Sequence, residues 1–168
     1  QRSVIQQNQN PDAIIVIDTL NLWIETTLSS LEKVLSNSNI LLINESEAFL
    51  LTNENDINNS ARSLLKMGPE IVVIKKGSRG AELFSLTEHI AVDAFPVTNV
   101  VDPTGAGDVF AGAFVASLAN EDSKETALLH ASASASISIE SFGIEKLQSA
   151  SNNEIKDRIN FLNKTLKS

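Results

Sequence analysis

The chain has 168 residues, of which 42% are hydrophobic and 20% charged, the length and composition of one globular domain with a substantial core. Its formal net charge of −8 argues against a nucleic-acid binder, and no apolar run is long enough to cross a bilayer. The absence of cysteine excludes disulfides and thiolate metal sites; without a secretory signal pattern either, we expect a cytoplasmic protein.

Strands and helices alternate along most of the chain, since short β-branched runs predict strands and apolar residues at helical spacing predict helices. This alternation predicts an α/β fold with a layered, mostly parallel sheet, in one domain over 13–168 after an irregular segment over 1–12. In chain order we expect a strand over 13–18, a helix over 27–35, a strand over 39–44, helices over 45–51 and 56–67, a strand over 70–75, a glycine turn over 77–80, antiparallel strands over 81–85 and 89–95, and helices over 106–118, 124–139 and 153–167.

Polar side chains follow several of the predicted strands. Asp18, Asn44 and Lys75 each stand at the end of a buried run. Ligands of parallel sheets gather at the carboxyl ends of the strands. The sequence therefore predicts that these side chains and the glycine-rich loop before residue 106 share one edge of the sheet.

The most informative segment runs from Asp102 to Asp108, with the sequence DPTGAGD, and leads into an apolar helix. The first backbone amides of a helix have no partner inside it, and with the helix dipole they attract anions. Gly105 and Gly107 let a ligand approach that backbone closely, and Asp108 stands beside it as a candidate base. This pattern suits phosphoryl transfer to a hydroxyl group. On the local pattern, a plain helix start in which Asp108 only complements the dipole carries equal weight.

Two familiar nucleotide motifs are excluded in this segment. The spacing from Gly107 to Gly112 fits a P-loop, but Ala113 stands where that motif needs lysine. Phe110 occupies the third glycine position of a dinucleotide fingerprint. The sequence thus predicts an anion-binding loop of another kind.

Two shorter motifs have a structural and a functional interpretation each. The run from Asn44 to Glu47 fits a helix capping box, and the alternative is that Glu47 acts on Mg²⁺ through water. The run from Lys75 to Gly80 fits a solvated hairpin turn, and the alternative is that Lys75 or the Gly77 backbone faces a nucleotide phosphate. Taken alone, each motif favours the structural interpretation.

Taken in this order, the three motifs resemble those of the ribokinase-like carbohydrate and nucleoside kinases, also called the phosphofructokinase-B family. Residues 102–108 match the family signature D-[TP]-x-G-A-G-D, residues 44–47 match N-x-x-E, and residues 75–80 match its nucleotide-side glycine turn. The resemblance extends over residues 13–143. It implies a three-layer α/β/α ribokinase-like fold.

The resemblance also implies an activity, transfer of the γ-phosphate of ATP to a hydroxymethyl group of a sugar or nucleoside. Asp108 would be the base, and the backbone amides of Gly105, Ala106 and Gly107 would form the anion hole. The remaining assignments are Asn44, Lys75, Gly77 and Gly80 to the nucleotide site, Glu47 to Mg²⁺, and Asp102 to a monovalent cation such as K⁺.

Two features depart from the family pattern. Many members have threonine at the position of Lys75, where lysine would add positive charge near the phosphates. Members are also longer, and nothing in this chain resembles their amino-terminal half with its small β lid. The chain resembles the carboxyl-terminal, ATP-side portion. Two alternatives therefore stay open: a non-catalytic nucleotide-binding module, and a structural half that forms a homo-oligomer through an exposed sheet edge.

Overall fold

Two compact units make up the computed structural model, which describes residues 3, 5, 7, 8 and 10–167. The first unit consists of Gln1–Lys75 and Leu83–His89, and the second of Lys76–Glu82 and Ile90–Ser168. The irregular segment expected over 1–12 lies partly outside the described residues. The single domain expected over 13–168 stays a prediction.

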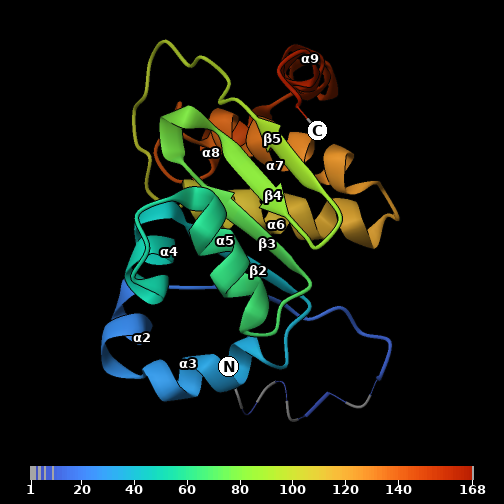
Figure 1. Ribbon diagram of the computed structural model, residues 1–168. Helices are drawn as coiled ribbons and strands as arrows, with labels where there is room; N and C mark the ends of the chain where they lie inside the picture. The colour runs from blue at the N-terminus through green and yellow to red at the C-terminus, as the bar shows by residue number, and fades with distance from the viewer. Residues whose placement is uncertain (1–2, 4, 6, 9, 168) are drawn as a thin grey trace. The chain divides into compact units, whose positions relative to one another are not determined.

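The strands form one sheet in the order β1-β2-β3-β4-β5 (Figure 1). β1, β2 and β3 pair in parallel, as the alternation of strands and helices predicts. The side chains of β2 and β3 are almost completely buried, as the continuous apolar runs of parallel strands require. The bounds are β1 (Val16–Asp18), β2 (Ile40–Asn44), β3 (Ile71–Lys75), β4 (Ala81–Phe84) and β5 (His89–Val92).

The parallel register aligns the polar strand ends of the first unit. Asn44, the last residue of β2, pairs with Lys75, the last residue of β3, and Asp18 of β1 pairs with Leu42 of β2. β1 begins at Val16 and is shorter than predicted. The N–H of the preceding residue, Ile15, donates to the Asn39 side chain at 2.8 Å, while its carbonyl accepts from the Ile40 N–H at 3.1 Å.

The helices of the first unit surround an apolar core. α4 and α5 lie side by side, and α5 also packs against β3 (Figure 1). Fully buried leucine, isoleucine and valine side chains from α3, β2, α5 and β3 meet in this core. The bounds are α2 (Asn21–Thr26), α3 (Leu28–Leu35), α4 (Glu45–Thr52) and α5 (Ile57–Lys66).

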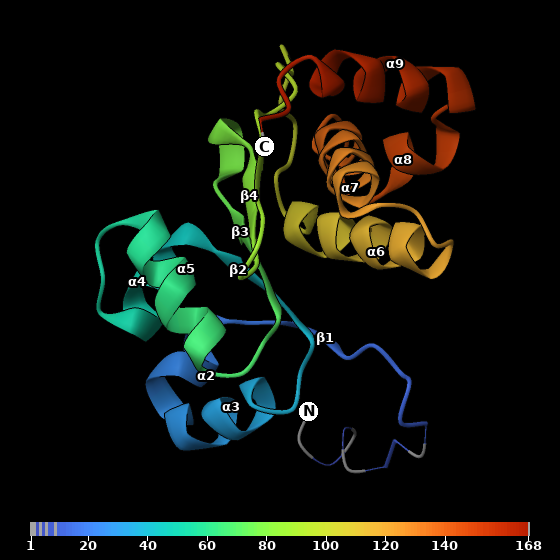
Figure 2. The same ribbon diagram turned by 45° about the vertical axis from the view of Figure 1, so that its right-hand side comes forward.

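The second unit is mainly helical, with α7 at its centre. α7 packs against α6, α8 and α9 (Figure 2). Its buried alanines at 127, 131 and 133 have short side chains, which allows neighbouring helices to approach closely. The bounds are η1 (Gly77–Arg79), α6 (Ala106–Ala119), α7 (Lys124–Ser138), α8 (Glu145–Ser149) and α9 (Asn152–Asn163).

The structure confirms the longer predicted helices and the predicted strands, with boundary shifts, and adds two short helices that the sequence did not indicate. α2 starts after Leu20, which offers no side-chain cap, and α8 contains only 5 residues. Neither has the capping signal or the length on which a sequence prediction depends. Within the described residues, no helix has both the length and the apolar character that a membrane crossing needs.

Candidate functional site

α6 begins directly after a glycine, Gly105, within the segment from Asp102 to Asp108. Gly105 is the N-cap of α6 and has φ of 78°, in the left-handed region that favours glycine. A Cβ built on Gly105 would meet nothing within 4 Å, so the residue borders open space. Glycine is therefore required at this position by backbone conformation and not by crowding.

The first-turn amides of α6 lack a side-chain cap. Gly105 has no side chain to supply one, and none is found among the described residues. The Ala106 N–H donates to the Pro103 carbonyl at 3.2 Å, so this amide already has a partner in the loop. The N–H groups of Gly107 and Asp108 are first-turn donors without an acceptor inside the helix, and the anion hole expected at Gly105, Ala106 and Gly107 stays a prediction.

The two carboxylates of the loop occupy different surroundings. Asp108 is exposed in the first turn of α6. Asp102 is half-buried and accepts a hydrogen bond from the Thr104 N–H at 2.9 Å. Hydrogen bonds from the Thr104 backbone and from its hydroxyl hold the pKa of Asp102 below its ordinary value. Asp102 thus stays charged at neutral pH and fixes the turn, whereas Asp108 is open to a ligand.

The end of α7 holds the start of this loop. The carbonyl of Ile139, the C-cap of α7, accepts hydrogen bonds from the N–H groups of Val101 at 2.8 Å and Asp102 at 3.2 Å. Two donors on one carbonyl tie the loop to that helix end.

A second polar cluster lies at the end of β2 in the first unit. The Asn44 side chain accepts from the Glu47 N–H at 2.8 Å, and the Glu47 carboxylate accepts from the Asn44 N–H at 3.3 Å. The capping box is therefore present in full. Glu47 is only 4% exposed, and the same carboxylate oxygen accepts from the Thr19 hydroxyl at 3.0 Å. This oxygen serves the fold.

Lys75 forms an ion pair that the sequence interpretation did not include. Its Nζ lies 2.6 Å from the Asp18 carboxylate, and both side chains are mostly buried. The extra positive charge expected of Lys75 is therefore balanced locally. The sequence analysis expects Asp18 and Lys75 at one edge of the sheet but not their direct contact, which joins residues 57 positions apart. The parallel order of β1, β2 and β3 supplies that information.

The glycine turn after β3 is built on two glycines with different surroundings. The Lys76 N–H donates to the Gly80 carbonyl at 2.8 Å, and the Gly80 N–H donates to the Gly77 carbonyl at 3.0 Å. A Cβ on Gly80 would overlap the backbone of Val92 and Asp93, whereas one on Gly77 would meet nothing within 4 Å. Gly80 is thus required for close backbone packing, and Gly77 faces open space.

The predicted site residues therefore fall into groups. Asn44, Glu47 and Lys75 come together in the first unit at the ends of β2 and β3. Asp102 and the loop to Asp108 come together in the second unit, which also contains the glycine turn. Among the described residues, no three His, Cys, Asp or Glu side chains gather as a metal-binding group. Thr19 is the member of the first group that the sequence analysis missed.

A sequence profile of the pfkB family of carbohydrate kinases matches residues 2–150. The chain belongs to this family. The predicted family is thereby confirmed. A pfkB relative, the cytidine kinase of Thermococcus kodakarensis, is 39% identical over 88 residues, which are 51% of this chain and 31% of that protein.

Solved structures agree with this family assignment. An E. coli structure described as a ribokinase II in complex with ATP and Mg²⁺ has a TM-score of 0.77 and 29% identity, covering 89% of this chain and 49% of that one. The Arabidopsis thaliana ribokinase complexed with ribose and ATP has a TM-score of 0.73 and 26% identity, covering 89% and 48%. The predicted ribokinase-like α/β fold is confirmed, and the chain spans less than half of each of these three relatives.

Proposed function

We propose that this pfkB chain contributes the phosphoryl-transfer loop of an ATP- and Mg²⁺-dependent kinase that phosphorylates a hydroxymethyl group of a sugar or nucleoside. The observation that carries the proposal is the start of α6, where a glycine with φ of 78° leaves the helix uncapped beside the exposed carboxylate of Asp108. The named activities of the relatives, cytidine kinase and ribokinase, support this class of acceptor.

In the proposed reaction Asp108 accepts the proton of the acceptor hydroxyl. The acceptor oxygen forms a bond to the γ-phosphorus while the bond from that phosphorus to the β–γ bridging oxygen breaks. The electron pair of the broken bond stays on the bridging oxygen, which leaves as part of ADP. The loop amides of Gly105, Ala106 and Gly107 were the predicted donors to the transferring group. Because the Ala106 N–H already donates to the Pro103 carbonyl, we propose the amides of Gly105 and Gly107 as the main donors, with the Asp108 amide beside them.

The residues present fit the ions that the family implies. Mg²⁺ takes few carboxylates and fills its other positions with water and phosphate oxygens, so one carboxylate, Glu47, is a sufficient protein contribution. Glu47 would act through water or through the carboxylate oxygen that does not cap α4. The charged Asp102 has the oxygen chemistry to hold a monovalent cation such as K⁺. Bound Mg²⁺ would neutralise charge on the phosphates.

We propose the remaining nucleotide contacts as predicted, with one change. Asn44 and the Gly77 backbone stay candidates for phosphate contacts, and Gly80 shapes the turn by close packing. Lys75 would act together with its partner Asp18, because separating a mostly buried ion pair leaves an uncompensated charge.

The alternative is a nucleotide-binding module without turnover, and the lengths of the relatives favour testing it directly. The chain spans 31% of the cytidine kinase, and an acceptor site needs residues that surround both substrates. Homo-oligomerisation also stays a prediction. It is supported by the place of β1 at one end of the strand order and by the exposed side chains of Leu20 and Leu22.

Two measurements on the 168-residue chain distinguish these functions. Calorimetric titration with ATP–Mg²⁺ measures nucleotide binding, and a coupled ADP-release assay with cytidine, ribose and related sugars and nucleosides measures turnover. Binding together with acceptor-dependent ADP release supports the kinase in this chain. Binding without turnover supports the module. Absence of ATP–Mg²⁺ binding contradicts both.

A further inference from the structure

A buried arginine on α9 reaches the end of α7. The Arg158 side chain is only 8% exposed, and with Leu162 it is one of the two buried residues of α9. A buried guanidinium needs partners for its N–H groups, because a buried charge left without them is strongly destabilising. The identity of those partners therefore tells what this residue holds in place.

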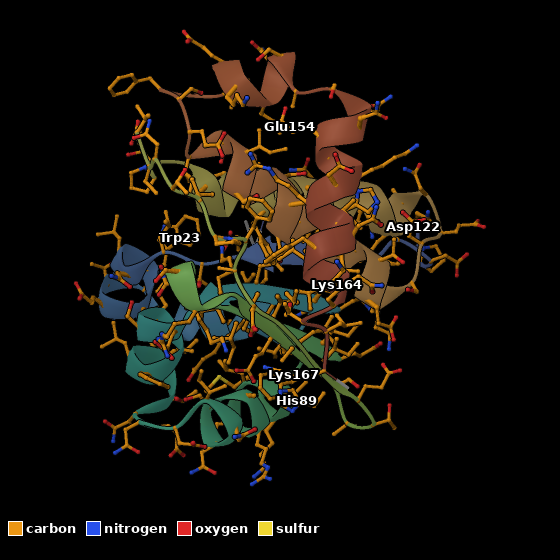
Figure 3. The ribbon with its side chains drawn as sticks, turned by 90° about the horizontal axis from the view of Figure 1, so that it is seen from above. Trp23, His89, Asp122, Glu154, Lys164 and Lys167 are labelled. Carbon is orange, nitrogen blue, oxygen red and sulfur yellow. The ribbon has the colours of Figure 1, made fainter. Side chains whose placement is uncertain are left out.

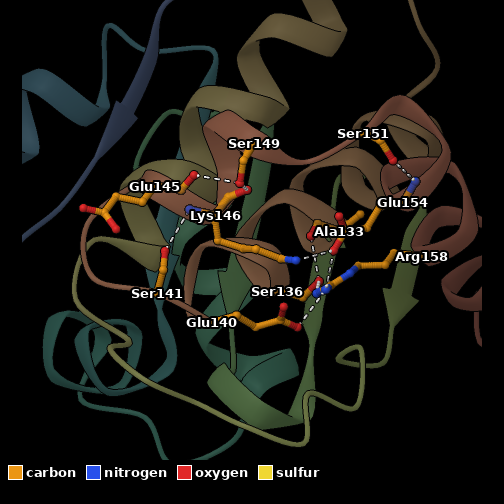
Figure 4. A network of polar contacts seen from close by, with 10 residues as sticks. All are labelled: Ala133, Ser136, Glu140, Ser141, Glu145, Lys146, Ser149, Ser151, Glu154 and Arg158. Carbon is orange, nitrogen blue, oxygen red and sulfur yellow. Dashed lines mark hydrogen bonds and ion pairs between the residues drawn. The ribbon is translucent and has the colours of Figure 1, made fainter.

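Two of its partners lie on the last turn of α7 and just beyond it. Nη1 donates to the Ser136 hydroxyl at 3.0 Å, and Nη2 donates to the Glu140 carboxylate at 2.7 Å (Figure 4). Nη2 also lies 3.3 Å from Glu154 on α9 itself. The guanidinium thus joins α9 to both sides of Ile139, the residue whose carbonyl holds the N–H groups of Val101 and Asp102.

The same guanidinium also contacts the segment that leads into the loop of residues 102–108. Its Cζ lies 4.6 Å from the ring centroid of Phe95, a cation–π arrangement. Phe95 in turn meets Phe161 of α9 edge to face, with ring centroids 5.3 Å apart. The segment from Phe95 to Asp102 is therefore held at its start by the ring contact and at its end through the α7 terminus.

We propose that Arg158 is a positioning residue for the loop of residues 102–108, acting through Ile139 and through Phe95. The inference rests on the proposed function of that loop. Among the described contacts, Arg158 does not touch residues 102–108. It contacts Phe95 and the end of α7, and the segment that leads into the loop runs between these two points.

The chemistry requires arginine in particular. A planar guanidinium can donate to Ser136 and Glu140 in two directions and still present its face to an aromatic ring. Lysine keeps the charge but has a single terminal nitrogen, so it cannot serve all three partners at once. Arg158→Lys should therefore restore only part of what Arg158→Met removes.

The test compares Arg158→Met with a matched control, Lys164→Met. Lys164 is an exposed cation at the other end of α9 from Glu154 (Figure 3), so the control removes the same charge from the same helix. NMR-detected hydrogen exchange is measured at the amides of Val101, Asp102 and, as an internal reference inside α6, Phe114.

We expect exchange at Val101 and Asp102 to rise about tenfold in Arg158→Met, by less in Arg158→Lys, and not in Lys164→Met. Phe114 should change much less. Equal acceleration at all three amides would mean a purely structural role, and no change at Val101 and Asp102 would also overturn the proposal. If Arg158→Met does not fold, the same comparison with Arg158→Lys and Glu140→Gln decides it.

ATP–Mg²⁺ affinity is the second measurement. We expect the dissociation constant for ATP–Mg²⁺ to rise about tenfold in Arg158→Met and less than twofold in Lys164→Met. This is the size of effect typical of residues that act on a site without touching its ligand. Unchanged ATP–Mg²⁺ affinity in Arg158→Met would overturn the link to function. If the unaltered chain binds no ATP–Mg²⁺, the proposed function fails, while hydrogen exchange still decides whether Arg158 holds the loop.

Discussion

The starts of α4 and α6 belong to two signature motifs of the same family, but they treat their first-turn amides in opposite ways. At α4, the Asn44 side chain accepts a hydrogen bond from the Glu47 N–H, and the Glu47 carboxylate accepts one from the Asn44 N–H. At α6, Gly105 caps nothing and the exposed carboxylate of Asp108 stands beside the helix end. At α4 the protein supplies its own hydrogen-bond partners, and at α6 the first-turn N–H donors are left available to a ligand.

This difference separates two uses of one structural feature. The first-turn amides of any helix need partners, and a capping residue supplies one at a gain of about 1 kcal/mol. A glycine in the left-handed region has no side chain to supply that partner, so the first-turn amides stay open. The comparison predicts that variants at the α4 cluster reduce stability more than variants at the α6 loop do, in addition to any loss of Mg²⁺ or phosphate contacts at Glu47 and Asn44.

The glycine turn provides the largest expected effect. Gly80→Ala should destabilise the protein by about 4 kcal/mol or more, because its Cβ would overlap the backbone of Val92 and Asp93 at a positive φ. Gly77→Ala is the matched control, since its Cβ meets nothing within 4 Å. Urea denaturation measures both. Similar midpoints for the two variants would mean that close packing is not the role of Gly80.

The closed cluster of α4 comes next. Glu47→Ala removes the acceptor of the Thr19 hydroxyl and the Asn44 amide, so we expect a loss of about 2 kcal/mol in the free energy of unfolding. Glu32→Ala, at an exposed helical position, should cost less than about 0.5 kcal/mol. An equal effect of the two substitutions in chemical denaturation would contradict a structural role for Glu47.

The open loop gives a smaller effect on stability and a larger one on ligand. Gly105→Ala should cost about 1 kcal/mol of unfolding free energy, because alanine pays the strain of a left-handed φ. It should also weaken ATP–Mg²⁺ binding. Gly112→Ala, inside α6 with open space around its Cβ, should instead stabilise by up to about 1 kcal/mol. The same sign for both variants would refute the backbone argument.

The smallest effect concerns Asp102 and pH. Two hydrogen bonds from Thr104 hold the pKa of Asp102 below its ordinary value of 3.8. Because the folded pKa is lowered, the stabilising contribution is complete above 3.8 and is lost as the pH falls through the folded pKa. Thr104→Val keeps the backbone donor but not the hydroxyl, so the pKa should rise partway. Carboxyl NMR titration measures it, with the exposed Thr87→Val as control; an unchanged pKa would contradict the assignment.

Local signals explain which parts could be predicted from sequence. The capping box at Asn44 and the glycine before Ala106 are encoded within a few residues, and the structure contains both helix starts. The shared sheet edge of Asp18 and Lys75 could be predicted, but their direct ion pair depends on strand order, and the contacts of Arg158 depend on how α9 meets α7. Such tertiary contacts leave no periodic or spacing signal. α2 was missed because it has no capping side chain to mark its start.

The central claim is that Asp108 is the base beside an open amide site, and turnover of Asp108→Asn tests it most directly. The variant is assayed in the protein form for which acceptor-dependent ADP release is detected, with exposed Asp157→Asn as control. We predict that kcat falls about a thousandfold for Asp108→Asn, while ATP–Mg²⁺ affinity and unfolding stay near those of the control. Turnover of Asp108→Asn close to that of the control would contradict the account.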